Sequence, residues 1–168
     1  MNALESSSNT SPTASPTTPP TEGADDPPSP LRAALAENKL RLLTALREAG
    51  VHCATISYFG EGDSGSIQHV DVSGADGSKP DVSRHCVIYL HCNGWFLRGQ
   101  WTSETRTEEL RLEDALRAFA DDAVTLHHDG YENNDGGSGE VIFDCVAGTV
   151  RLEHVNYYTE SDCTDTDL

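Results

Sequence analysis

Apolar side chains recur at helical spacing in two stretches of the chain. The first begins at Ser29-Pro30, because a hydroxyl residue before a proline is typical of a helix start, and it stops at Gly50. Its apolar positions are Leu31, Leu35, Leu42, Leu46 and Ala49. The second stretch has apolar positions at Leu112, Leu116, Phe119, Ala123 and Leu126. These spacings predict helices over 31–49 and 111–128.

Strand-like segments occupy much of the remaining chain, and they come in pairs. Residues 51–59 are rich in β-branched and aromatic side chains, and the pattern resumes over 66–72 after a break at Gly60–Gly65. We therefore predict a hairpin with a glycine-rich turn. A second hairpin is predicted at Asn93-Gly94, since this dipeptide favours a two-residue turn. Such a turn pairs Cys92 with Trp95 and Leu90 with Leu97.

A third hairpin is predicted around Ala147-Gly148, which separates the strand patterns 141–146 and 149–155. A two-residue turn at this point places apolar pairs on one face and an opposite-charge pair on the other. The predicted pairs are Cys145 with Val150, Phe143 with Leu152 and Asp144 with Arg151.

The order helix, hairpin, hairpin, helix, hairpin predicts an α+β fold, in which an antiparallel sheet of β-hairpins carries two helices on one face. Residues 1–29 are rich in Pro, Ser and Thr and almost lack apolar side chains, so we interpret them as a disordered tail. Residues 30–159 then form a single domain. The acidic residues 160–168 are expected to be a frayed C-terminus.

Acidic residues dominate the charge of the chain. The formal net charge is -17, with 28 Asp and Glu against 11 Lys and Arg. Because phosphate neutralisation requires clustered bases, this balance opposes direct binding to nucleic acid or to an anionic membrane surface. No stretch of the sequence is long and apolar enough to span a bilayer. The acidity instead predicts a protein partner with a basic face, and mimicry of DNA is one form of such binding.

The five cysteines predict reduced thiols in a cytoplasmic protein. Their number is odd, no C-x-x-C spacing occurs, and the N-terminal stretch lacks the basic start and apolar core of a signal peptide. Cys53, Cys86 and Cys92 each follow a histidine, but neighbours on a strand point to opposite faces and chelate one ion poorly. Zinc binding and Cys-His catalysis are the alternatives.

Two stretches rich in glycine and acids are the most informative parts of the sequence. The first is Gly60–Gly65, and the second runs over 132–140 with three carboxylates, two amides and three glycines. One interpretation is structural, because glycine and asparagine supply positive φ or room for close backbone approach. The glycines with this predicted role are Gly62, Gly65, Gly136 and Gly139.

The other interpretation of these stretches is chemical. If both lie at one end of the sheet, four carboxylates converge, and such hard oxygen ligands favour Mg²⁺ or Ca²⁺ over zinc. A carboxylate in the cluster can also act as a general acid or base. The predicted ligands are Asp63, Glu132, Asp135 and Glu140.

The same stretches resemble two motifs of a known family. Gly60–Gln68 is similar to G-x-G-D-S-G-x-I-[EQ], and Gly130–Asp144 is similar to G-W-E-N-N-x-G-x-x-G-E-x-x-F-D. Tyr158-Thr159 matches the closing pair of that family, and Tyr131 replaces its usual Trp. The family is an uncharacterised bacterial group of small acidic domains that plasmids and other mobile elements frequently encode. The resemblance implies a shared fold and a set of candidate residues, namely Asp63, Ser64, Tyr131, Glu132, Asn133, Asn134, Asp135 and Glu140.

Two functional hypotheses follow from the sequence. The first is a soluble, non-enzymatic accessory or interaction module, linked to mobile elements through the resemblance. The second is a metal-dependent hydrolase built on the two acidic loops. Convergence of Asp63 with Glu132 and Glu140 around a cation favours the enzyme, whereas carboxylates spread over a surface favour the binding module.

Overall fold

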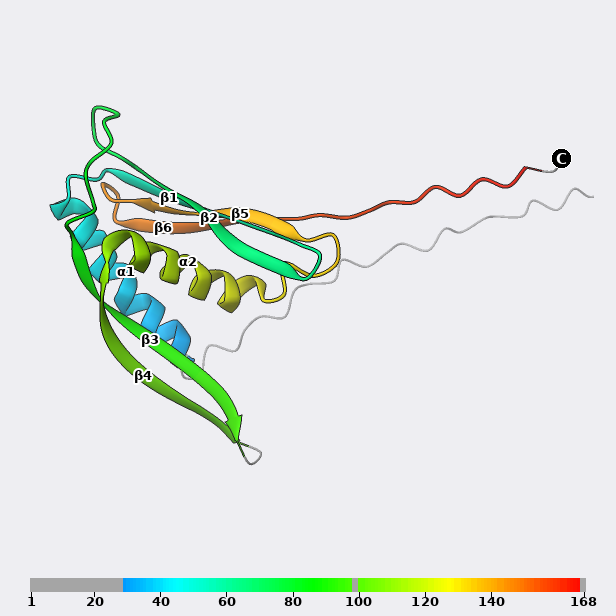
Figure 1. The fold of residues 1–168 in the computed structure, drawn as a ribbon, viewed down its shortest axis with the longest axis horizontal. Helices are drawn as coiled ribbons and strands as arrows, with labels where there is room; N and C mark the ends of the chain where they lie inside the picture. Colours follow the sequence, from blue (N-terminus) through cyan, green and yellow to red (C-terminus); the bar gives the residue numbers. More distant parts are fainter. Residues whose placement is uncertain (1–28, 98–99, 167–168) are drawn as a thin grey trace, which may run out of the picture.

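A computed structural model of the protein describes residues 29–97 and 100–166. Residues 1–28 of the tail predicted over 1–29 lie outside these residues, and Ser29 caps the first helix. Within them the chain forms two helices and six strands, so the predicted α+β class is confirmed (Figure 1). The elements are α1 Pro30–Glu48, β1 Cys53–Glu61, β2 Ser64–Ser73, β3 Cys86–Leu97, β4 Gln100–Arg111, α2 Leu112–His128, β5 Gly137–Asp144 and β6 Thr149–Asn156.

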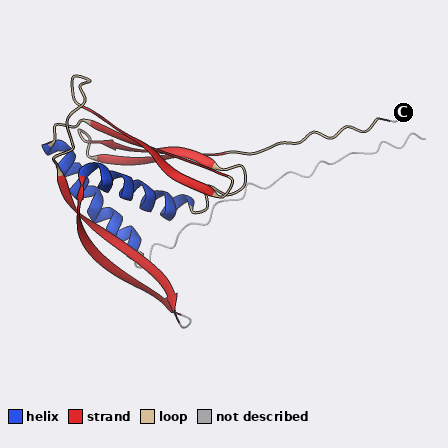
Figure 2. Cartoon of the chain, in the orientation of Figure 1, coloured by secondary structure: helices blue, strands red, loops and turns tan. Residues whose placement is uncertain are grey.

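The strands divide between two antiparallel sheets instead of joining in one. Four strands form a sheet in the order β2-β1-β5-β6, while β3 and β4 form a separate two-stranded hairpin. Both helices lie on one face of the four-stranded sheet, as predicted (Figures 1 and 2). The β3–β4 hairpin runs beside α1, on the side of the helices that faces away from this sheet. The helices are therefore enclosed between a sheet and a hairpin.

The ends of α1 follow from local chemistry. The Ser29 hydroxyl oxygen accepts a hydrogen bond of 3.2 Å from the Arg32 backbone N–H. At the other end Gly50 adopts a φ of 76° and donates its N–H to the Arg47 carbonyl at 3.0 Å. Both predicted helices are confirmed. In the described part of the chain, no helix is long and apolar enough to cross a membrane.

The turn predicted at Asn93-Gly94 is wrong. Strand β3 continues through both residues, and Asn93 pairs with Glu104 while Gly94 pairs with Ser103. Neither Asn93 nor Gly94 has the positive φ that a two-residue turn requires. The physical reason is the long partner strand β4, whose repeated β-branched threonines favour extended backbone and pair with β3 along its whole length.

The register predicted for the last hairpin is wrong by two residues. The structure pairs Phe143 with Val150 instead of Leu152. The cause is the side chain of Asp144, whose Oδ1 accepts hydrogen bonds from the backbone N–H groups of Val146 and Ala147, at 3.0 and 2.8 Å. These bonds stabilise a four-residue connection between β5 and β6. A shift of two residues leaves every side chain on its predicted face.

The core lies between α2 and the four-stranded sheet and extends across α1 to β3. Phe119 of α2 contacts Phe143 of β5 edge-on, with ring centroids 5.1 Å apart. Tyr89 of β3 extends the core to the hairpin. Its side chain is fully buried, and its hydroxyl donates a hydrogen bond to Asp122 Oδ2 at 2.7 Å. Burial raises the pKa of both groups, so the tyrosine stays protonated and acts as the donor.

Polar side chains of α1 complete the hydrogen bonding of β3. Asn38 is 1% exposed, and its amide donates to the Leu90 carbonyl and accepts from the Leu90 N–H, both at 2.8 Å. Arg41 Nη1 donates to the Ile88 carbonyl at 2.7 Å. The helix therefore supplies the partners that another strand would otherwise provide along this edge.

Replacement of Asn38 by alanine is expected to destabilise the domain strongly. Asn38→Ala leaves the N–H and C=O of Leu90 without partners, and each unsatisfied buried group costs about 1–3 kcal/mol. Urea unfolding measures the free-energy difference. Asn93→Ala, the same substitution at an exposed position of β3, is the matched control and is expected to stay within about 0.5 kcal/mol of wild type. Equal losses in the two variants would contradict the role assigned to Asn38.

Candidate functional site

The first glycine-rich stretch forms the tight turn between β1 and β2. Gly62 and Asp63 have φ angles of 60° and 65°, and Glu61 pairs with Ser64 on either side of them. Two consecutive positive φ angles define the two-residue turn that matches the twist of a hairpin. The Asp63 N–H donates to the Glu132 carbonyl at 3.0 Å. The two stretches singled out in the sequence therefore touch each other.

The second stretch connects α2 to β5 through two successive tight turns. The Asn133 N–H donates to the Gly130 carbonyl, and the Gly136 N–H donates to the Asn133 carbonyl, both at 3.0 Å. Gly130, Asn134 and Gly136 have φ angles of 75°, 58° and 81°. Glycine and asparagine tolerate this region best, which accounts for their density in the segment.

Tyr131 links the two stretches, because its ring lies against a pair of glycines. Gly60 of β1 pairs with Gly65 of β2. A methyl group added to Gly60 would lie 2.8 Å from the Tyr131 ring and from Glu132 Cα, and one on Gly65 would lie 2.4 Å from the Tyr131 oxygen. The ring also contacts Tyr58 edge-on, with centroids 5.2 Å apart. The absence of side chains at positions 60 and 65 thus leaves the space that the ring of Tyr131 occupies.

The other predicted glycines also serve close approach. A methyl group on Gly136 would lie 1.9 Å from the Gly60 carbonyl oxygen, and one on Gly139 would lie 2.0 Å from the Glu153 carbonyl oxygen. Neither neighbour can move without displacing main chain. The geometric role predicted for Gly62, Gly65, Gly136 and Gly139 is confirmed.

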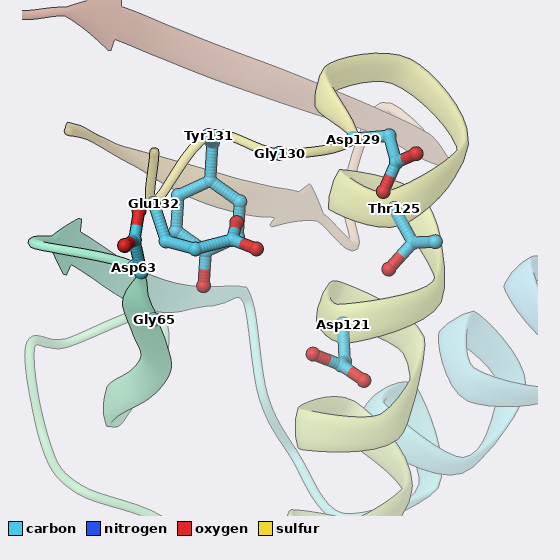
Figure 3. Close-up of a pocket in the computed structure, with 8 residues that line it drawn as sticks. All are labelled: Asp63, Gly65, Asp121, Thr125, Asp129, Gly130, Tyr131 and Glu132. Atoms are coloured by element: carbon cyan, nitrogen blue, oxygen red, sulfur yellow. The ribbon is translucent and has the colours of Figure 1, made fainter. Parts of the chain in front are cut away.

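Four carboxylates surround a small cavity beside Tyr131, and we call this cavity the acidic pocket. Its volume is about 190 Å³, and Figure 3 shows Glu132 on one side of it facing Asp121 and Thr125 of α2. Among the described residues that line it, none is basic. The lining residues are Asp63, Gly65, Asp121, Thr125, Asp129, Gly130, Tyr131 and Glu132.

The environment of the pocket keeps its tyrosine protonated. Burial raises the pKa of the Tyr131 hydroxyl, and the carboxylates of Asp121 and Glu132 raise it further. The phenol therefore remains a neutral hydrogen-bond donor and acceptor, and the negative charge of the site resides on its four carboxylates.

The predicted convergence of four carboxylates on a cation is not found. Asp63 and Glu132 line the acidic pocket, but Asp135 binds the Thr159 backbone N–H and accepts from its hydroxyl at 2.9 Å. Glu140 is exposed between the core-facing residues Gly139 and Val141, so strand alternation places it on the opposite face of the sheet. Within the described ranges, no three His, Cys, Asp or Glu side chains are grouped to hold a metal ion.

The remaining candidates have structural positions. Ser64 begins β2 after the turn, and Asn133 and Asn134 are exposed in the second turn segment. Sequence reasoning missed three residues of the pocket, which are Asp121 and Thr125 of α2 and Asp129 directly after the helix. Their spacing of four residues, directly before the Gly130 motif, is a helical polar stripe and was the signal that could have revealed them.

Tyr58 belongs to a second group of polar side chains, which sequence reasoning also missed. The Tyr58 hydroxyl lies 2.8 Å from His154 Nδ1, and His154 Nε2 lies 2.9 Å from Asn156 Oδ1. Burial, with a smaller effect of Tyr131, raises the pKa of Tyr58 to about 12. The His154 ring stacks on His128, with centroids 4.0 Å apart, and thereby joins the end of α2 to β6.

Together these features define a small α+β domain in which two glycine motifs hold an aromatic ring beside an acidic pocket. The chain belongs to the family of unknown function DUF6878, whose family model matches residues 34–167. The match covers both glycine motifs and all the residues of the pocket. No curated protein and no solved structure is significantly similar to the chain.

A methyl group at Gly65 is expected to destabilise the domain through its clash with Tyr131. Gly65→Ala should cost about 1–3 kcal/mol in wild type, because overpacking forces the ring to move. In a Tyr131→Ala background the same change should cost far less, since the three atoms nearest to the added group all belong to the side chain of Tyr131. Gly136→Ala is the control, because its clash is with the Gly60 backbone and persists in both backgrounds. Thermal and urea unfolding give the free energy of unfolding of each variant in this double-mutant cycle. Equal costs of Gly65→Ala in both backgrounds would contradict packing of the Tyr131 ring on Gly65.

The stacked histidines are expected to make stability depend on pH. Burial and the neighbouring His154 and His127 lower the pKa of His128 in the folded state. Between this value and the ordinary histidine pKa of about 6.5, the unfolded chain binds a proton that the folded chain does not. Stability should therefore fall as the pH is lowered through this window, and His128→Gln should reduce the slope. Unfolding free energies from pH 8 to 5 test this, with His69→Gln on the exposed part of β2 as the control; an unchanged slope in His128→Gln would count against it.

Proposed function

We propose that the domain is a cytoplasmic interaction module that holds a basic side chain of a partner protein in the acidic pocket. The observation that carries the proposal is the lining of the pocket, where the described residues supply four carboxylates and no base. The five cysteines are free thiols, which supports a reducing compartment. The mobile-element setting implied by the motif resemblance belongs to the same proposal.

The chemistry of the pocket suits a guanidinium or ammonium group. Asp121 and Glu132 provide carboxylates on opposite sides for charge-assisted hydrogen bonds, and the ring of Tyr131 offers an aromatic surface to a cation (Figure 3). The volume of about 190 Å³ lies below the range of about 300–1,000 Å³ that is typical of small-molecule sites. One long side chain fills such a space better than a substrate does.

The net charge of the chain favours the same kind of partner. A charge of -17 creates a negative field that accelerates the approach of a basic surface and repels acidic ones. The positions of Glu140 and Asp135 remove two of the four ligands on which the alternative of a metal-dependent hydrolase depended. Binding of a basic group therefore has the better support.

The proposal predicts selective binding of arginine. Titration of the ¹⁵N-labelled chain with Nα-acetyl-arginine methylamide should shift the backbone amides of residues 121–132, whereas the neutral citrulline analogue should not. The double variant Asp121→Asn, Glu132→Gln should weaken the arginine analogue at least about tenfold, because each charge-assisted hydrogen bond contributes about 1.5–3 kcal/mol.

The control removes the same charge elsewhere. Glu104→Gln with Glu109→Gln takes two carboxylates from the exposed strand β4 and should leave the affinity within about twofold, since distant surface charges are screened by salt. An equal loss in both double variants would show diffuse attraction and not a pocket. Equal shifts with the citrulline analogue would also end the proposal.

A further inference from the structure

Strand β6 forms an open edge of the four-stranded sheet. Its neighbour on one side is β5, and no described strand pairs with the other side. An open edge presents a row of backbone N–H and C=O groups to any extended chain that approaches it. Val150 and Leu152 pair with the buried Phe143 and Val141 and so face the helices.

An apolar groove follows this edge on the side of the helices. Its volume is about 310 Å³, and it is enclosed by β6, α1 and α2. Leu35 and Phe119 form its buried floor, while Leu126, Val150 and Leu152 are half-buried along its walls. Partly exposed apolar walls beside an open strand are what alternate side chains of an added strand would cover.

The charged side chains along this groove differ in sign from the net charge of the chain. Lys39 from α1 and His127 from α2 line it, and none of the described residues in its lining is acidic. In a chain of net charge -17 this local excess of bases selects a ligand that carries carboxylates. The groove shares none of its residues with the acidic pocket, because α2 presents a different face to each.

We propose that β6 and this groove bind an extended acidic segment of a second partner protein by strand addition. The segment pairs its backbone with β6, inserts apolar side chains from alternate positions between Leu35, Leu126 and Leu152, and places a flanking carboxylate near Lys39. Main-chain hydrogen bonds give such binding its affinity and the groove gives it specificity.

A second copy of this chain fits the groove less well. Pairing β6 with β6 of another copy would bring two basic rims together, each with Lys39 and His127. Like charges at an interface oppose association. The inference is independent of the acidic pocket, and the two surfaces together would let the domain join a basic partner to an acidic one.

A selection of random peptides tests the assignment. The full chain is immobilised and a displayed library of ten-residue peptides is enriched on it. We expect enriched peptides to carry apolar residues at alternate positions with at least two acidic residues. A synthetic copy of the most enriched peptide should slow hydrogen–deuterium exchange of β6 amides. Its affinity should fall at least about tenfold in Lys39→Glu and in Leu152→Glu, since one reverses a charge and the other places a charge in the apolar wall.

Control variants separate this site from the other surface and from unfolding. Lys79→Glu makes the same charge change away from the groove, and Asp121→Asn with Glu132→Gln alters only the acidic pocket; both should leave peptide affinity unchanged. Melting temperatures show that each variant is folded. Absence of enriched peptides, enrichment without alternation, unprotected β6 amides or unchanged affinity in Lys39→Glu would each overturn the assignment. So would a dimer in sedimentation that Leu152→Glu dissociates, because the second copy would then be the occupant.

Discussion

Close contact between two stretches of bare backbone is the constraint on which the rest of this end of the molecule depends. Gly136 lies so near the Gly60 carbonyl that no side chain fits between them, and Gly60 with Gly65 leaves room for the ring of Tyr131. The ring in turn fixes the loop that carries Glu132. The four carboxylates that line the pocket repel one another, and packing of this loop against the sheet holds Glu132 in place against that repulsion.

The sequence predicts elements whose determinants are local. A serine–proline start and a glycine stop suffice for α1, and the spacing of apolar residues suffices for α2. Strand pairing is harder, because the registers at Asn93 and Asp144 depend on the partner strand and on side-chain hydrogen bonds in the turn. The position of Glu140 depends on which face of β5 meets the helices, and that is a tertiary property. The glycine motifs were recognisable, whereas the contribution of α2 to the pocket lay outside them.

Helix α2 separates two surfaces of opposite chemistry. Asp121, Thr125 and Asp129 face the acidic pocket, while Phe119, Leu126 and His127 face the groove beside β6. The stacked rings of His128 and His154 connect the same helix to β6, so one helix forms a wall of both sites and presents a different face to each.

The amide of Asn38 has a consequence for colloidal behaviour. By occupying the Leu90 backbone it protects the middle of β3 as a neighbouring strand would, and Arg41 does the same at Ile88, whereas the outer rim along β4 pairs with no described strand. That rim carries Glu104, Arg106, Glu108 and Glu109, and charges of this density discourage stacking of chains into fibrils. Hydrogen bonds from α1 on one rim and charged side chains on the other thus oppose edge-to-edge association of this hairpin.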